Sequence, residues 1–171
     1  PWTPLFPSDA IMPAGAEFGI KPFGIRAMDA MRLEKSYRLV GTELSIEYAA
    51  LESGLHRFVH LNKGDFKGRQ QLSEWQEAGF ANMMVTLEVH DTTDADAIGG
   101  NPITLPDGTV IGRATSGGYG FRLGKSLALA MVRSDLATVG TELMIDVLDQ
   151  RLRATILEES PYDPDNQRLR A

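Results

Sequence analysis

The chain contains no cysteine, which excludes disulfide bonds and metal sites built on thiolates. It also lacks an apolar run long enough to span a bilayer, and it shows no signal-peptide pattern. Basic residues are outnumbered by acidic ones, 17 to 23, so the net charge is −6 and the isoelectric point is near 5.1. Nucleic acids and anionic membranes attract basic surfaces. We therefore expect a cytoplasmic protein without a nucleic-acid or membrane partner.

What remains is the composition of an ordinary globular protein, 43% hydrophobic and 23% charged. Its 171 residues suffice for one domain or two small ones with a sizeable core. Because the chain begins with Pro1 rather than methionine, we expect it to be part of a longer polypeptide. Proline is frequent in residues 1–22 and opposes regular structure there, and only SDAIM, at 8–12, indicates a capped helical turn.

The stretch up to Gly79 carries mainly helical signals. Proline near the start, followed by Arg, Ala, Met, Leu, Glu and Lys, predicts a helix over 22–36. Glycine closes two further helical patterns, EYAALESGL at 47–55 and the stretch over about 67–78. Alternation in HRFVHL, residues 56–61, predicts a strand between them.

After Gly79 the pattern changes to short alternating strands separated by turn residues. The PDG sequence at 106–108 predicts a hairpin, and SLALAMV at 126–132 predicts a strand. Six or so strands with no helix between them predict an antiparallel barrel or sandwich. The fold prediction is therefore α+β: a partial, mainly helical domain with short strands at 1–79, followed by a six-stranded antiparallel β-barrel at 80–171.

The stretch GGYGFRLGKS resembles a phosphate-binding loop only superficially. That motif needs a glycine five residues before its Gly-Lys-Ser, and this position is Tyr119. The following SLALAMV predicts a strand, whereas a phosphate loop leads into a helix N-terminus. We therefore interpret the stretch as a wide glycine turn between two barrel strands.

No metal site is predicted. His56 and His60 are four residues apart, which in a strand separates them by roughly 13 Å, too far for one ion. The acidic loop DTTDAD lacks the spacing of a calcium loop. No Ser-His-Asp or paired-glutamate constellation stands out either, so no catalytic residue is predicted.

The predicted first helix carries charges among apolar residues and has little polar face. A charge in apolar surroundings costs several kcal/mol unless it is paired. Asp29 has Arg26 three residues before it and Arg32 three residues after it, while Glu34 needs a partner from elsewhere. We interpret these four residues as a structural charge network on a salt-bridged framework helix. The alternative, a helix between two domains or beside a polar ligand, stays open.

Four stretches, in order and at about the expected spacing, resemble the glycine-cleavage T-protein (aminomethyltransferase) superfamily: GIRAMDAMRLEKSYRLVGTEL, LESGL, KGDFKGRQQL and GRATSGGYGFRLGKSLALAMV. The resemblance covers roughly residues 14–171 and is closest to the folate-binding half of dimethylglycine and sarcosine dehydrogenases. It implies tetrahydrofolate bound in the centre of a ring of three small domains. It also implies transfer of a one-carbon unit from an aminomethyl or iminium carrier to N5 of the folate.

The resemblance further implies roles for particular residues. Tyr37 matches the family tyrosine that follows RLE-x-x and contacts the folate. The family triplet ARD is AMD here, so Met28 replaces an arginine on the folate side, which favours a dehydrogenase-linked or other methyltransferase branch. The family's C-terminal tail turns back toward the folate, so Arg168 or Arg170 is expected to contact a folate glutamate carboxylate.

Two functions follow from the resemblance. The first is the C-terminal part of a tetrahydrofolate-dependent aminomethyltransferase-like protein acting on a methylated glycine, with its N-terminal domains and catalytic aspartate outside this chain. The alternative is a non-catalytic folate-binding or structural barrel module of a flavin-dependent dehydrogenase. FAD is expected only if a further N-terminal domain exists, and the chain alone is expected to be inactive.

Overall fold

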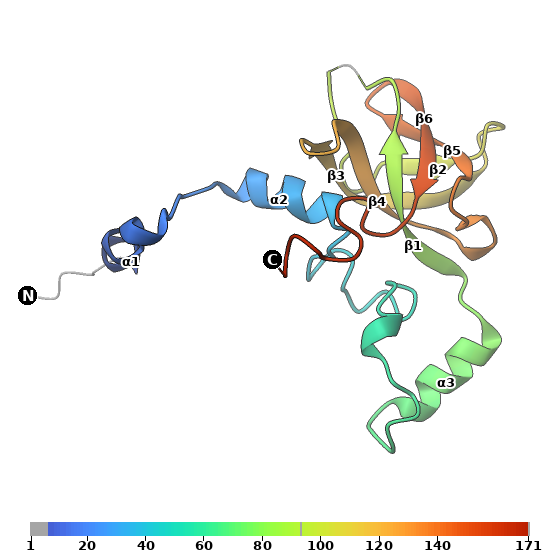
Figure 1. The fold of residues 1–171 in the computed structure, drawn as a ribbon. Helices are drawn as coiled ribbons and strands as arrows, with labels where there is room; N and C mark the ends of the chain where they lie inside the picture. Colours follow the sequence, from blue (N-terminus) through green and yellow to red (C-terminus); the bar gives the residue numbers. More distant parts are fainter. Residues whose placement is uncertain (1–6, 93, 171) are drawn as a thin grey trace, which may run out of the picture.

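A barrel and the helices outside it make up the architecture (Figure 1). The computed structural model describes residues 7–92 and 94–170. Within them, the helices precede six strands that close into a barrel, which confirms the predicted α+β fold class. The helices are α1 (Pro7–Gly15), α2 (Ile25–Glu34) and α3 (Arg69–Ala78), and the strands are β1 (Asn82–Val89), β2 (Pro102–Thr104), β3 (Val110–Gly120), β4 (Lys125–Arg133), β5 (Glu142–Val147) and β6 (Gln150–Leu157).

The barrel strands are joined in the order β1-β4-β3-β2-β5-β6, and every pair is antiparallel. Strand β5 alternates between exposed or partly exposed and buried residues, as expected of a strand with one covered face. Strand β4 is buried on both faces instead. One face contributes Ala128, Ala130 and Val132 to the barrel interior, and the other contributes Leu127, Leu129 and Met131 to a cluster with Leu33 of α2. Residues 127–132, LALAMV, are therefore apolar on both faces of the strand because Leu33 of α2 packs on the outer one.

The glycines of β3 allow α2 to lie close to the barrel. A Cβ atom at Gly118 would lie 3.2 Å from Leu33 Cδ1, and one at Gly120 would lie 3.0 Å from Glu34 Cγ. Strand β3 runs through Gly120, so these glycines belong to a strand and not to the wide turn that we predicted. The LGKS sequence leads into strand β4, whereas a phosphate loop requires a helix there.

Residues 47–55 form successive turns, so the predicted helix is wrong. Side chains of this segment bond to the backbone: Glu52 Oε2 accepts from the Ala49 N–H at 2.8 Å, and Ser53 Oγ donates to the Glu43 carbonyl at 2.8 Å. Such bonds offer the backbone an alternative to helical pairing. The segment still ends at Gly54, whose φ of 72° is typical of a terminating glycine.

The strand predicted at residues 56–61 is also wrong, because His56–Phe58 form a short 3₁₀ helix. A strand needs a partner for its backbone groups, and no described strand pairs with this segment. The predicted separation of His56 and His60 along a strand therefore no longer applies.

The helices differ from the prediction mainly at the N-terminus. Helix α1 is longer than the single turn expected and contains Pro13, while residues 1–6 of the predicted irregular segment lie outside the described residues. Helix α1 stands apart from the barrel, joined to α2 by an extended segment (Figure 1).

Within the described ranges, no helix combines the length and the apolar character needed to cross a bilayer.

A buried ion pair joins α2 to the segment that follows it and to the barrel. Arg32 is only 9% exposed, and its Nη1 atom lies 3.5 Å from Oε2 of the fully buried Glu43. The same Nη1 donates to Ser116 Oγ of β3 at 3.0 Å, and Arg32 Nε pairs with Asp29 at 3.1 Å. Asp29 is partly exposed. The helix therefore directs the buried Arg32 side chain toward the barrel, while Asp29 lies nearer the solvent.

The Glu43 carboxylate is surrounded by donors. It accepts hydrogen bonds from the hydroxyls of Thr115, Ser116 and Thr42 and from the Leu39 N–H. Burial raises the pKa of Glu43, but the bonds from Ser116, Thr115, Leu39 and Thr42 lower it further than burial raises it, so the pKa lies below the ordinary value of 4.5. The side chain is therefore held as a carboxylate inside the protein.

We predict that replacing Arg32 with alanine lowers the free energy of unfolding by about 3–5 kcal/mol, because Glu43 would remain as a buried charge without its cation. Urea titration of the variant measures the loss. Arg26→Ala is the matched control, since Arg26 lies exposed on the same helix and is expected to change stability by less than about 0.5 kcal/mol. A loss under about 1 kcal/mol for Arg32→Ala would contradict the account.

We predict that Glu43→Gln is less stable than the wild type at neutral pH and that the difference shrinks in acid. Because the folded pKa of Glu43 is lowered, its carboxylate stabilises the fold above pH 4.5, and this contribution is lost as the pH falls through the folded pKa. Urea midpoints of both proteins from about pH 7 to about pH 3 test this. A difference that is constant over that range would argue against the assignment.

Candidate functional site

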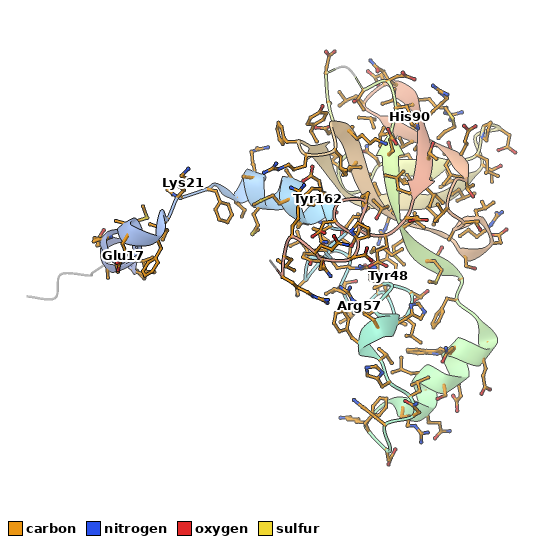
Figure 2. The ribbon with its side chains drawn as sticks, viewed as in Figure 1. Glu17, Lys21, Tyr48, Arg57, His90 and Tyr162 are labelled. Carbon is orange, nitrogen blue, oxygen red and sulfur yellow. The ribbon has the colours of Figure 1, made fainter. Side chains whose placement is uncertain are left out.

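The end of α2 and the C-terminal tail, residues 158–170, enclose a pocket of about 320 Å³, here named the tail pocket. Backbone and side-chain bonds hold the tail against α2: the Tyr162 N–H donates to the Glu34 carbonyl at 3.0 Å, and Lys35 Nζ donates to the Asp163 carbonyl at 2.6 Å. Figure 2 shows Tyr162 beside α2. The pocket is lined by Met31, Glu34, Lys35, Tyr37, Arg122, Tyr162, Asp163, Arg168 and Leu169.

The segment between α2 and Val40 fixes both the tail and the barrel in place. Ser36 Oγ bonds Thr86 Oγ1 of β1 at 2.7 Å and accepts from the Ser160 N–H at 3.0 Å. Arg38 pairs with Glu159 and donates to the Ser36 carbonyl at 3.0 Å. The residues beside the tail pocket are therefore connected to α2, to strand β1 of the barrel and to the C-terminal tail.

Two aromatic rings with nearby cations characterise the tail pocket. Lys35 Nζ lies 6.0 Å from the centre of the Tyr37 ring, and the Arg168 guanidinium lies 6.0 Å from the centre of the Tyr162 ring. Tyr37 is 38% exposed, so its ring is accessible to a ligand. Arg122 adds a third basic side chain to the lining. The pocket can therefore stack a planar group and attract carboxylates.

Glu34 supplies an acidic group at the same place. Its Oε1 atom accepts from the Arg122 N–H at 2.6 Å and from the Leu123 N–H at 3.1 Å. The partner that the sequence left open is thus the backbone of the turn between β3 and β4. Glu34 is buried and lines the pocket, and both of these hydrogen bonds go to Oε1.

The structure brings some of the predicted site residues together and separates others. Tyr37 and Arg168 line the tail pocket, as does Glu34, whereas Arg170 is exposed outside its lining. Asp29 and Arg32 pair with each other outside the pocket. Arg26, which we placed in the charge network, lies exposed on α2 outside the pocket lining. Met28, which stands where the family has an arginine on the folate side, is also exposed on α2 outside the lining.

Sequence analysis missed Lys35, Arg122 and Tyr162 in the pocket and Glu43 in the buried network. Lys35 follows directly on the RLE stretch and could have been included with Tyr37. Arg122 reaches the pocket only because β3 and β4 form a hairpin under α2, which no spacing reveals. Within the described ranges, no group of three or more His, Asp or Glu side chains is arranged to hold a metal ion.

Comparison with known protein families gives two matches. The family model of the glycine cleavage T-protein C-terminal barrel domain matches residues 82–163, and that of the GCVT N-terminal domain matches residues 7–63. A solved structure of the glycine cleavage system aminomethyltransferase T from Bartonella henselae superposes with a TM-score of 0.83, covering 92% of this chain and 44% of that one. At 20% identity this similarity shows a shared fold alone.

Individual relatives are longer than this chain. Human dimethylglycine dehydrogenase, a mitochondrial protein, is 41% identical over 152 residues, which is 88% of this chain and 17% of the relative. An aminomethyltransferase of Moorella thermoacetica is 37% identical over 152 residues, which is 86% of this chain and 40% of the relative. The chain thus spans less than half the length of these relatives. The matches of both family models, in chain order, and the relatives at this identity show that the chain belongs to the glycine-cleavage T-protein (aminomethyltransferase) superfamily, and its residues 82–163 match the C-terminal barrel domain.

Proposed function

We propose that this chain supplies one wall of a tetrahydrofolate site in an aminomethyltransferase-like protein. The whole protein would pass a one-carbon unit from an aminomethyl or iminium carbon of a methylated glycine to the folate. The observation that carries the proposal is the tail pocket, in which Tyr162 and Arg168 of the tail lie with Tyr37 and Glu34 at the end of α2.

The lining fits the chemistry of a folate. A folate carries a planar pterin with an N–H donor edge, an aromatic linker and glutamate carboxylates. Tyr37 and Tyr162 offer ring faces for the planar groups, and Glu34 offers a carboxylate oxygen to N–H donors. Arg122 and Arg168 are the groups that would bind the glutamate carboxylates.

The part played by this chain is positioning, and we assign no proton transfer to it. Transfer to a folate amine depends on holding that amine against the electrophilic carbon in a site closed to water. The rigid junction of α2, the barrel and the tail would fix one side of the folate. On this proposal, the catalytic aspartate that the resemblance implies and the donor site would belong to further domains of a longer polypeptide. FAD would likewise be bound by such a domain.

A second candidate function is a non-catalytic folate-binding or structural barrel module of a flavin-dependent dehydrogenase. Two observations favour it: the similarity to dimethylglycine dehydrogenase, and Met28, exposed on α2, where the T-protein pattern has arginine. Turnover of a methylated glycine by the longer polypeptide, with and without tetrahydrofolate, distinguishes the two. Formation of a one-carbon folate supports the first function, and its absence with intact dehydrogenation supports the second.

We predict that the isolated chain binds tetrahydrofolate with a dissociation constant no tighter than about 1 mM. Good ligand sites bury about 70–90% of a ligand, whereas this pocket encloses one side, and one stacking face does not offset the freedom lost on binding. Isothermal titration gives the constant. Nuclear magnetic resonance at millimolar folate should show the weak contact as shifts of the Tyr37 and Tyr162 signals.

Tyr37→Ala should remove the shift of the Tyr162 signal, whereas Tyr119→Ala should leave the shifts of both signals unchanged. Tyr119 is a matched control because it is 40% exposed, close to the 38% of Tyr37, and lies outside the pocket lining. A micromolar constant that Tyr37→Ala abolishes would show that the site is complete within this chain. Shifts confined to other residues, or unaffected by Tyr37→Ala, would refute the tail pocket as the folate site.

A further inference from the structure

A hydroxyl, an imidazole and a carboxylate lie next to one another on the barrel, outside the lining of the tail pocket. Thr155 comes from β6, Glu88 comes from β1, and His90 follows directly after β1. Figure 2 shows His90 beyond β1, at the opposite end of the barrel from α3. Neither the folate proposal nor the buried network uses these three residues.

The antiparallel pairing of β1 with β6 brings the three side chains together. Glu88 lies opposite Thr155 in the register, and the His90 N–H donates to the Arg153 carbonyl at 2.8 Å. Glu88 and Thr155 point outward, because the residues on either side of each belong to the barrel interior. His90 and Thr155 are 65 positions apart in the sequence, so no local motif reveals the arrangement.

The His90 ring contacts a different partner at each nitrogen. His90 Nε2 lies 2.8 Å from Thr155 Oγ1, and His90 Nδ1 lies 3.9 Å from Glu88 Oε1. A carboxylate beside Nδ1 favours the tautomer that carries its hydrogen there. We therefore assign Nε2 as the acceptor, to which the Thr155 hydroxyl donates. In this tautomer His90 can remove the proton of that hydroxyl.

Lys125 of β4 holds the Glu88 carboxylate in place. Its Nζ donates to Glu88 Oε2 at 2.7 Å, which leaves Oε1 on the side of the imidazole. The Glu88 side chain is 19% exposed and that of His90 is 30% exposed, so the ring is the more accessible of the two. A hydroxyl beside a base that a third group orients is the arrangement of an activated nucleophile, and its contacts are often longer before a substrate binds.

We propose that Thr155 is an acyl-accepting nucleophile that reacts with activated carboxylic esters. Thr155 Oγ1 attacks the ester carbonyl carbon, and His90 Nε2 takes the hydroxyl proton. Collapse of the tetrahedral intermediate breaks the bond to the leaving alcohol, which takes that proton from His90, and the acyl group stays on Thr155 Oγ1. A water molecule, deprotonated by His90 in the same way, then hydrolyses this ester and restores Thr155.

The strand surface determines which esters can react. Strand β1 is paired on both sides, with β4 and with β6, so its backbone N–H groups are engaged in the sheet. The negative oxygen of the tetrahedral intermediate is then stabilised mainly by water, without the preorganised donors that speed acyl transfer. Esters with a good leaving group, such as phenyl esters, are therefore the expected class. The proposal does not depend on folate binding.

Release of nitrophenolate from p-nitrophenyl acetate by the full chain tests the proposal. We expect Thr155→Val and His90→Gln to lower the protein-dependent rate at least about fivefold, because general-base catalysis typically contributes more than this. Thr155→Ser keeps a hydroxyl and should retain the rate. The matched controls are Thr141→Val and His60→Gln, which change a half-buried threonine and an exposed histidine elsewhere and should leave the rate unchanged.

Two further measurements assign the roles of the three residues. Mass spectrometry after acid quenching should locate the acetyl group on Thr155. Nitrogen NMR of the His90 ring should show the hydrogen on Nδ1 in the wild type and a loss of this preference in Glu88→Gln, as expected of a positioning residue.

A Thr155→Val protein as fast as the wild type would show that His90 or another group reacts alone, and it would overturn the proposal. Acetyl groups confined to lysine side chains, or a wild-type His90 ring with its hydrogen on Nε2, would overturn it as well.

Discussion

The buried pair of Arg32 and Glu43 is the interaction on which the rest of this structure depends. Two charges removed from water are costly unless other groups complete their hydrogen bonding. Here the completing groups come from strand β3, through Thr115 and Ser116, and from the Leu39 backbone. Since these partners are far apart in the sequence, the pair is satisfied only when α2, the following turns and the barrel are all in place.

The tail pocket follows from that arrangement. Once α2 lies on β3, Glu34 reaches the turn after β3, and the residues that follow it reach β1 and the tail. The glycines of β3 permit this approach, because side chains at Gly118 or Gly120 would meet Leu33 or Glu34. The pocket therefore results from the packing of α2 against the barrel. Its ligand chemistry depends on the C-terminal tail, which has no regular secondary structure.

The sequence predicted the fold where periodicity is local, and it failed where tertiary contacts decide. Strands β1 to β6 have alternating sequences or end at clear turn residues, so the barrel could be predicted from the sequence. The segment 47–61 has helix and strand propensity, but Glu52 and Ser53 bond the backbone and no described strand pairs with residues 56–58. Tyr37 and Arg168 came from resemblance, whereas Arg122 and Tyr162 required knowledge of which loops meet.

A double-mutant cycle between Arg32 and Glu43 tests the central claim most directly. The free energies of unfolding of Arg32→Met, Glu43→Gln and the double variant are compared with that of the wild type at neutral pH. The account predicts a coupling energy of about 1 kcal/mol or more, with the double variant more stable than the sum of the single losses implies. A coupling energy near zero would show that each residue acts alone and that the pair does not hold α2 to the barrel.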